Sequence, residues 1–158
     1  MKWIYSLLLV ASFLSYRRLN SIVVTLLYLV IAEWGMNQAR QPLYDYVKTL
    51  EHNEAVVLWS LTWFFFYFFT LVAIQLSHKR LNLSSSRSSL FVVNSLLALM
   101  VLQTLRLVDD QFLVTDWIAV LYRFGVPSIN VSVGLVLAWV ISKEIISDSR
   151  VYRHYFNG

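Results

Sequence analysis

The segment SIVVTLLYLVIAEWGMNQ, residues 21–38, decides the fold because it is a long apolar run that contains a single carboxylate, Glu33. A helix of this length rises about 27 Å, close to the roughly 30 Å hydrocarbon core of a bilayer. Residues 55–77, 90–108 and 127–142 have the same character. We therefore expect an all-α bundle with four transmembrane helices.

The composition also indicates an integral membrane protein. The chain is 58% hydrophobic and 14% charged, whereas soluble domains average roughly half and a quarter. It has no Cys, which excludes disulfides, thiolate metal sites and cysteine nucleophiles. At 158 residues its length suits one domain, so residues 1–158 are treated as a single membrane domain.

The first apolar segment is shorter and ends at Arg17 and Arg18. Its length suits a signal-peptide core or an interfacial segment, but residues 11–15, ASFLS, lack a clean pair of small residues for a cleavage site. We expect residues 1–16 to form a short, tilted or partly inserted helix, a candidate fifth span. A tight turn then leads to Asn20 or Ser21 as the next N-cap.

The basic residues give the orientation because they gather in alternate connections. The opposite connections, 41–54 and 109–126, carry only Lys48 and Arg123 and are acidic overall. The positive-inside rule predicts that the C-terminus and the tail 143–158 lie in the cytoplasm. We expect the chain to be integral to the cell inner membrane. The basic set is Arg17, Arg18, Lys79, Arg80, Arg87, Lys143, Arg150 and Arg153.

The two acidic loops are patterned. Apolar residues recur at helical spacing in residues 42–53 and 112–124, and Pro42 suits the first position of a helix. We therefore expect short amphipathic helices on the outer membrane surface. The basic connection 79–89 has instead the serine-rich composition of a flexible linker.

Two ionisable residues lie within the expected spans, Glu33 and Arg106. Both come late in helices that run outward, so they belong at similar depths in the outer leaflet. We predict a buried Glu33–Arg106 pair that orients neighbouring helices, supported by Asn37 and Gln103. In the alternative, Arg106 turns towards Asp109 and Asp110, three and four residues on, and Glu33 is protonated or faces water. A proton or ion site at Glu33 is the functional reading of the same residues.

The last expected span contains a small or weakly polar residue at every fourth position, a pattern that lets another helix approach closely. A contact within one chain and a contact between copies are both compatible with it. We call these residues the small-residue ridge: Asn130, Gly134, Ala138 and Ser142.

The tail interleaves cations with aromatic residues. Such a mixture occurs in nucleic-acid interfaces, but beside a membrane it more simply indicates an anchor to anionic lipid or a docking strip for a cytoplasmic protein. No nucleic-acid partner is expected. The residues concerned are Arg150, Tyr152, Arg153 and Tyr155.

The aromatic run 59–69 places rings all round its helix, which favours packing and lipid contact over a quinone or other flat cofactor. Paired axial haem ligands are not expected, because all the histidines fall in expected connections or the tail. These are His52, His78 and His154.

The acidic residues Asp109, Asp110 and Asp116 are ligand types for a hard cation, but a solvated helix end explains them more simply. No Ser–His pair, paired membrane aspartates or histidine cluster is evident in the sequence. We therefore expect no catalytic residue, no metal and no cofactor.

These features favour a non-catalytic, multi-pass membrane subunit: an oligomeric anchor, scaffold or envelope sensor in contact with the bilayer and a cytoplasmic protein. An envelope-sensing subunit of a stress or antiviral system would have this anatomy. The alternative is an oligomeric ion channel, holin-like pore or small transporter with Glu33 and Arg106 near the pathway.

Overall fold

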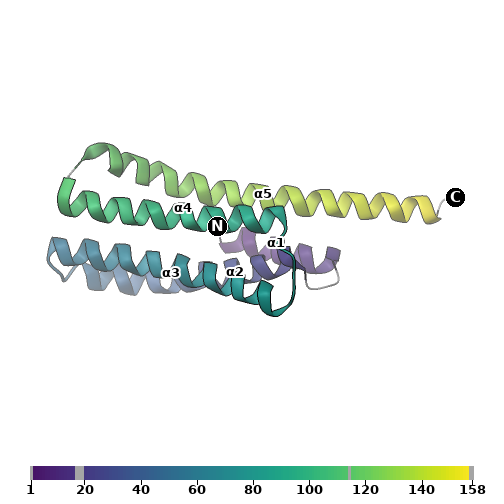
Figure 1. The fold of residues 1–158 in the computed structure, drawn as a ribbon, viewed down its shortest axis with the longest axis horizontal. Helices are drawn as coiled ribbons and strands as arrows, with labels where there is room; N and C mark the ends of the chain where they lie inside the picture. The colour runs from purple at the N-terminus through teal and green to yellow at the C-terminus, as the bar shows by residue number, and fades with distance from the viewer. Residues whose placement is uncertain (1, 17–19, 114, 157–158) are drawn as a thin grey trace.

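The computed structural model is an all-α bundle and describes residues 2–16, 20–113 and 115–156. Four apolar helical spans are long enough to cross a bilayer: Ser21–Val47, His52–Arg80, Arg87–Phe112 and Trp117–Ile146. The predicted all-α, multi-pass membrane fold is therefore confirmed. The elements are α1 (Lys2–Tyr16), α2 (Ser21–Val47), α3 (His52–Arg80), α4 (Arg87–Val108), the π-helical turn η1 (Asp109–Leu113) and α5 (Asp116–Phe156) (Figure 1).

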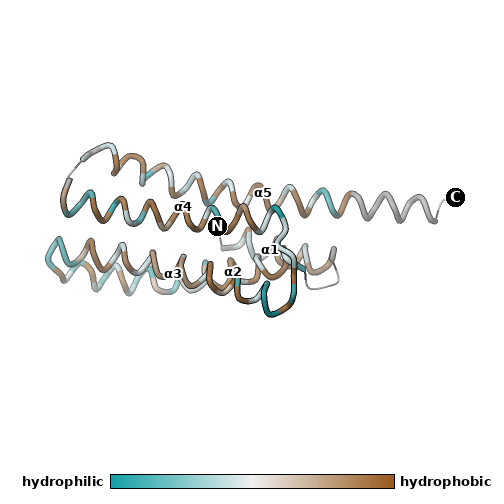
Figure 2. Tube along the Cα trace, in the orientation of Figure 1, coloured by the Kyte–Doolittle hydropathy of each residue, from teal (hydrophilic) through white to brown (hydrophobic). Residues whose placement is uncertain are grey.

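Large apolar side chains cover the outside of the bundle. Phe69 is 62% exposed, Leu135 66% and Trp139 72%. Figure 2 shows hydrophobic residues along the helices and hydrophilic residues at the connections between them. In water such a surface would drive aggregation, whereas in a bilayer it contacts lipid tails, and the helices satisfy their own backbone hydrogen bonds.

The helices form a ring in chain order, and α1 closes it by packing against both α2 and α5. With 15 residues, α1 is about 22 Å long and covers only part of the bundle. Figure 1 shows its N-terminus midway along the other helices. The bundle thus has two different ends: the α2–α3 end, where α2 meets α3 and α4 meets η1, and the α3–α4 end, where α1 lies.

Most of the apolar core lies in the part of the bundle that α1 covers. Its buried members come from all five helices, and Leu26 and Leu137 are fully buried. Polar side chains are buried towards both ends of the bundle: Ser21, Thr25 and His78 near the α3–α4 end, and Ser60, Gln103 and Asp109 towards the α2–α3 end. The apolar core therefore lies between two sets of buried polar groups.

The expected outer-surface helices are not separate elements in the structure. Residues 42–47 continue α2, with Pro42 inside the helix, and residues 116–126 form the first turns of α5. Leu43 of α2 and Val126 of α5 pack against the core. Burial of this apolar face therefore favours continuing each helix without a break. Pro42 in α2 and Pro127 in α5 each remove one backbone hydrogen bond, a loss that membrane helices tolerate.

Candidate functional site

A polar cavity of about 250 Å³ lies between α2, α3, α4 and α5, in the part of the bundle that α1 does not reach. On the α2 side it is lined by Glu33, Asn37 and Arg40. The spacing of four and then three residues puts these side chains on one face of the helix. Glu33 and Arg40 are two turns apart, a rise of about 10 Å. The cavity therefore has an acidic inner end and a basic end towards the α2–α3 connection.

Gln103 supplies the α4 side of the cavity and is 2% exposed. Its Nε2 donates a hydrogen bond of 2.9 Å to the Tyr122 hydroxyl on α5. Its Oε1 is buried and has no hydrogen-bond partner among the described residues. A buried acceptor without a donor costs about 1–3 kcal/mol, so a water molecule or a ligand that donates to this atom would stabilise the protein.

Aromatic rings form the rest of the lining. Trp59 and Trp63 on α3 meet edge to face with ring centroids 5.3 Å apart, and both line the cavity with Tyr67 and Tyr122. The faces of such rings carry negative electrostatic potential and attract cations. Together with Glu33, this wall favours a positively charged group at the inner end.

Glu33 also lines a second, smaller cavity of about 50 Å³, together with Tyr5, Tyr67 and Asn130. The second cavity reaches into the region that α1 covers. Glu33 therefore lies at the boundary between the polar cavity and the apolar core.

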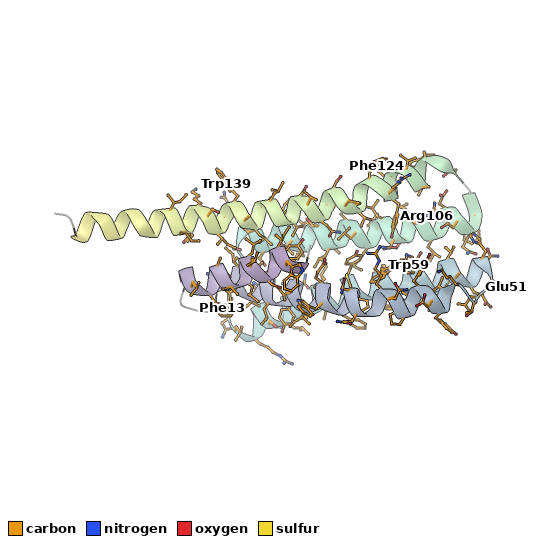
Figure 3. The ribbon with its side chains drawn as sticks, turned by 180° about the vertical axis from the view of Figure 1, so that it is seen from behind. Phe13, Glu51, Trp59, Arg106, Phe124 and Trp139 are labelled. Carbon is orange, nitrogen blue, oxygen red and sulfur yellow. The ribbon has the colours of Figure 1, made fainter. Side chains whose placement is uncertain are left out.

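Arg106 pairs with the aspartates that follow it, which is the Arg106 part of the alternative arrangement. Its Nη2 lies 2.7 Å from Asp110 Oδ1, and its Nη1 lies 3.4 Å from Asp109 Oδ2. The chain continues from α4 into η1 without leaving a helical path, which returns both carboxylates to the Arg106 face. Arg106 lines a neighbouring cavity with Asp110 and Trp59 and is not among the residues that line the polar cavity with Glu33. Arg106 and Trp59 are labelled in Figure 3.

Asn37 and Gln103 share a cavity with Glu33, and Arg106 is not part of that lining. All three residues line the polar cavity, and the hydrogen bond of Gln103 goes to Tyr122. Asp109 has its own partner in addition to Arg106, since it accepts hydrogen bonds from the main chain and the hydroxyl of Thr115. These bonds join η1 to the start of α5.

The Arg106 arrangement can be tested by double-mutant cycles. We expect Arg106→Gln and Asp110→Asn to show a coupling energy of about 0.5 kcal/mol, as for helical ion pairs three or four residues apart. Arg106→Gln and Glu33→Gln should show none. Unfolding in mixed detergent micelles, followed by circular dichroism, measures both cycles. Coupling of Arg106 to Glu33 instead would restore the predicted pair.

The small-residue ridge is used in part within the chain. The Tyr5 hydroxyl of α1 donates to the main-chain carbonyl of Asn130 at 3.1 Å. A Cβ atom at Gly134, which is a buried position, would meet nothing within 4 Å, and Ser142 is exposed. None of the described helices therefore packs closely on these two positions. Self-association through the ridge stays a prediction.

Two glycines offer a matched test of helix packing. A Cβ at Gly35 would lie 3.2 Å from a Phe66 ring carbon, whereas Gly134 has open space. We expect Gly134→Ala to raise the free energy of unfolding by up to about 1 kcal/mol, the helix-propensity gain. Gly35→Ala should raise it less or lower it, since Phe66 must shift. Equal gains would contradict this packing, and loss of a cross-linked oligomer in Gly134→Ala alone would place the ridge between copies.

The tail residues Arg150, Tyr152, Arg153 and Tyr155 fall within α5, whose helix continues to Phe156. Their side chains lie outside the described residues, so the predicted lipid or protein contact of the tail stays a prediction. Figure 1 shows α5 extending past the other helices at the α3–α4 end.

A buried serine–histidine cluster, which was not predicted, joins α2, α3 and α4 at the α3–α4 end. His78 is 5% exposed and lies inside α3 rather than in a connection. Its Nε2 is 2.8 Å from Ser21 Oγ and 3.4 Å from Ser89 Oγ, and its Nδ1 is 2.8 Å from the Ile74 carbonyl oxygen. Thr25 completes the cluster through a 2.8 Å contact with Ser89 Oγ.

The serine-rich connection is correspondingly not a loose linker throughout. Ser86 caps α4 by accepting a hydrogen bond from Ser89 N, and the main-chain N–H of Ser86 donates to Ser21 Oγ. Ser88 and Ser89 are buried. The sequence carried one usable signal: His78 continues the four-residue spacing of Thr70 and Ile74 along the buried face of α3.

The serine–histidine cluster has a nucleophile and a base in contact, as hydrolases do, but its polar groups are engaged with one another and buried. We expect His78→Leu to lower the free energy of unfolding by about 1–3 kcal/mol, because the Ser21 and Ser89 hydroxyls lose a buried partner. The exposed His52→Leu is the matched control and should change it by less than about 0.5 kcal/mol. Thermal unfolding in detergent measures both, and equal effects would contradict a packing role.

The fold and the cavity define an integral membrane protein with a polar internal cavity at one end of its helical bundle. No protein-family model, curated protein or solved structure matches the chain. The described residues also contain no group of three or more His, Asp or Glu side chains placed to hold a metal ion.

Proposed function

We propose that the protein is a non-catalytic subunit of the cell inner membrane, an anchor or sensor that takes a ligand at its polar cavity and a protein partner at its tail. The carrying observation is the cavity itself, in which the buried Gln103 Oε1 lacks a donor beside the carboxylate of Glu33. A purely structural bundle gains nothing from such an atom, because an apolar side chain of similar size would avoid its cost.

The charge pattern supports an orientation for this proposal. Lys79, Arg80 and Arg87 flank the α3–α4 connection, whereas the acidic residues Glu51 and Glu54 lie at the α2–α3 end. The positive-inside rule favours a cytoplasmic α3–α4 end. The cavity then faces the outer side, and the projecting part of α5 reaches into the cytoplasm.

The length of α5 supports the output side of the proposal. It has 41 residues, about 60 Å of helix, twice the hydrocarbon thickness. The helix lines the cavity at Tyr122 and Val126 and then continues to Phe156. One continuous helix thus connects the cavity with the tail. This connection suits a sensor in a stress or antiviral system that assembles into a homo-oligomer.

A small transporter or oligomeric channel is the second candidate. It is favoured by one observation: Glu33 lines both the polar cavity and the smaller one that reaches towards the core. A carboxylate between two cavities is a feature of ion and proton pathways.

Flux measurements separate the two candidates. We expect the purified full chain in liposomes to pass ions no faster than protein-free liposomes. We also expect deletion of residues 143–158 to release a stoichiometric partner that copurifies with the full chain from native membranes. Conductance that Glu33→Gln abolishes and Glu54→Gln leaves intact would overturn the anchor or sensor proposal.

A further inference from the structure

The polar cavity is lined by α2 and α5 at a level where α1 does not join these two helices. Between α2 and α5 the ring is closed by α1, which packs on both, and the described parts of α2 and α5 do not pack extensively on each other. The Trp3 ring of α1 meets the Trp34 ring of α2 at a centroid distance of 6.4 Å, so α1 begins level with Glu33. Beyond that level towards the α2–α3 end, no helix among the described residues bridges α2 and α5 on this side of the cavity.

The charges along α2 select a ligand with two opposite charges. Glu33 lines the inner end of the cavity and Arg40 the outer end, about 10 Å further along the same helix face. Arg40 also lines a neighbouring cavity of about 710 Å³ together with Tyr44 and Trp59. A cationic group fits beside Glu33, and a bulkier anionic group fits beside Arg40.

The inner end further selects a cation that carries N–H groups. Gln103 Oε1 needs a donor, and the Glu33 carboxylate accepts only. The rings of Trp63 and Tyr67 attract either a primary or a quaternary ammonium. Only the primary ammonium can also donate to the amide oxygen and the carboxylate.

We propose that the polar cavity binds the headgroup of a phospholipid with a primary ammonium, such as phosphatidylethanolamine, which enters between α2 and α5. Its ammonium lies between Glu33 and Gln103, its phosphate lies at Arg40, and its acyl chains stay in the bilayer. The inference deepens the proposed function and rests on it, since it names the ligand of the same cavity. A soluble phosphoethanolamine shares the headgroup chemistry and is the competing source.

Native mass spectrometry of the purified full chain in detergent tests the proposal. Phosphatidylethanolamine should bind at least about tenfold more tightly than phosphatidylcholine with the same acyl chains, because choline lacks N–H donors. The lipid should also raise the melting temperature. Equal binding of the two lipids would overturn the proposal, and this comparison requires no variant. Soluble phosphoethanolamine binding as tightly as the lipid would overturn the membrane source.

Variants locate the site. Glu33→Gln, Arg40→Gln and Gln103→Leu should each weaken phosphatidylethanolamine binding about tenfold, as expected for loss of a charged or buried polar contact. The matched controls Glu54→Gln and Arg123→Gln lie outside the cavity lining and should leave binding unchanged. Unchanged binding in a folded Glu33→Gln protein would overturn the proposed site.

The two levels of the proposal fail separately. An absence of lipid selectivity, with no ion flux and with a partner held through residues 143–158, would overturn the ligand and leave the anchor or sensor in place. Selective lipid binding together with Glu33-dependent conductance would overturn the anchor or sensor and leave the lipid ligand in place.

Discussion

The short length of α1 is the constraint on which the rest of the structure depends. At 15 residues it cannot run beside all of α2 and α5, so five helices pack at one end of the bundle and four at the other. The five-helix part holds the fully buried Leu26 and Leu137. The four-helix part holds the polar cavity. One truncated helix thus separates a region built for stability from a region that can admit a ligand.

The two ends treat buried polar groups in opposite ways. At the α3–α4 end, Ser21 and His78 have partners inside the chain, so the serine–histidine cluster adds packing without inviting a ligand. At the α2–α3 end, Gln103 has a partner for its nitrogen only. Gln103 Oε1 is therefore an exception to the pairing seen at the α3–α4 end, and it belongs to a residue that lines the polar cavity.

The spans were predictable from the sequence because hydropathy and length decide them, and the apolar runs are uninterrupted. The partner of Arg106 was not, because it depends on whether the chain turns away after Val108 or continues helically through η1. A continuation of one turn brings Asp110 within 2.7 Å. For the same reason residues 42–53 were predicted to form a surface helix: Pro42 usually opens helices, but here α2 continues past it to Val47, with Leu43 packed partly buried against the core.

The candidate site could not be predicted because it depends on how α4 is rotated about its axis. Glu33 and Gln103 were both identified as polar residues within spans. Whether Gln103 lies near Glu33 or near Arg106 depends on that rotation, which the residue spacing within one helix does not give. Tyr122 fixes the amide of Gln103 towards the cavity from α5, five residues before Pro127. Pro127 removes the hydrogen bond to the Arg123 carbonyl and locally loosens the helix. A ligand that binds the free oxygen of Gln103 would therefore contact the part of the bundle that adjoins Pro127, the described position in α5 where proline weakens the backbone. From Pro127 onwards, α5 continues to the tail.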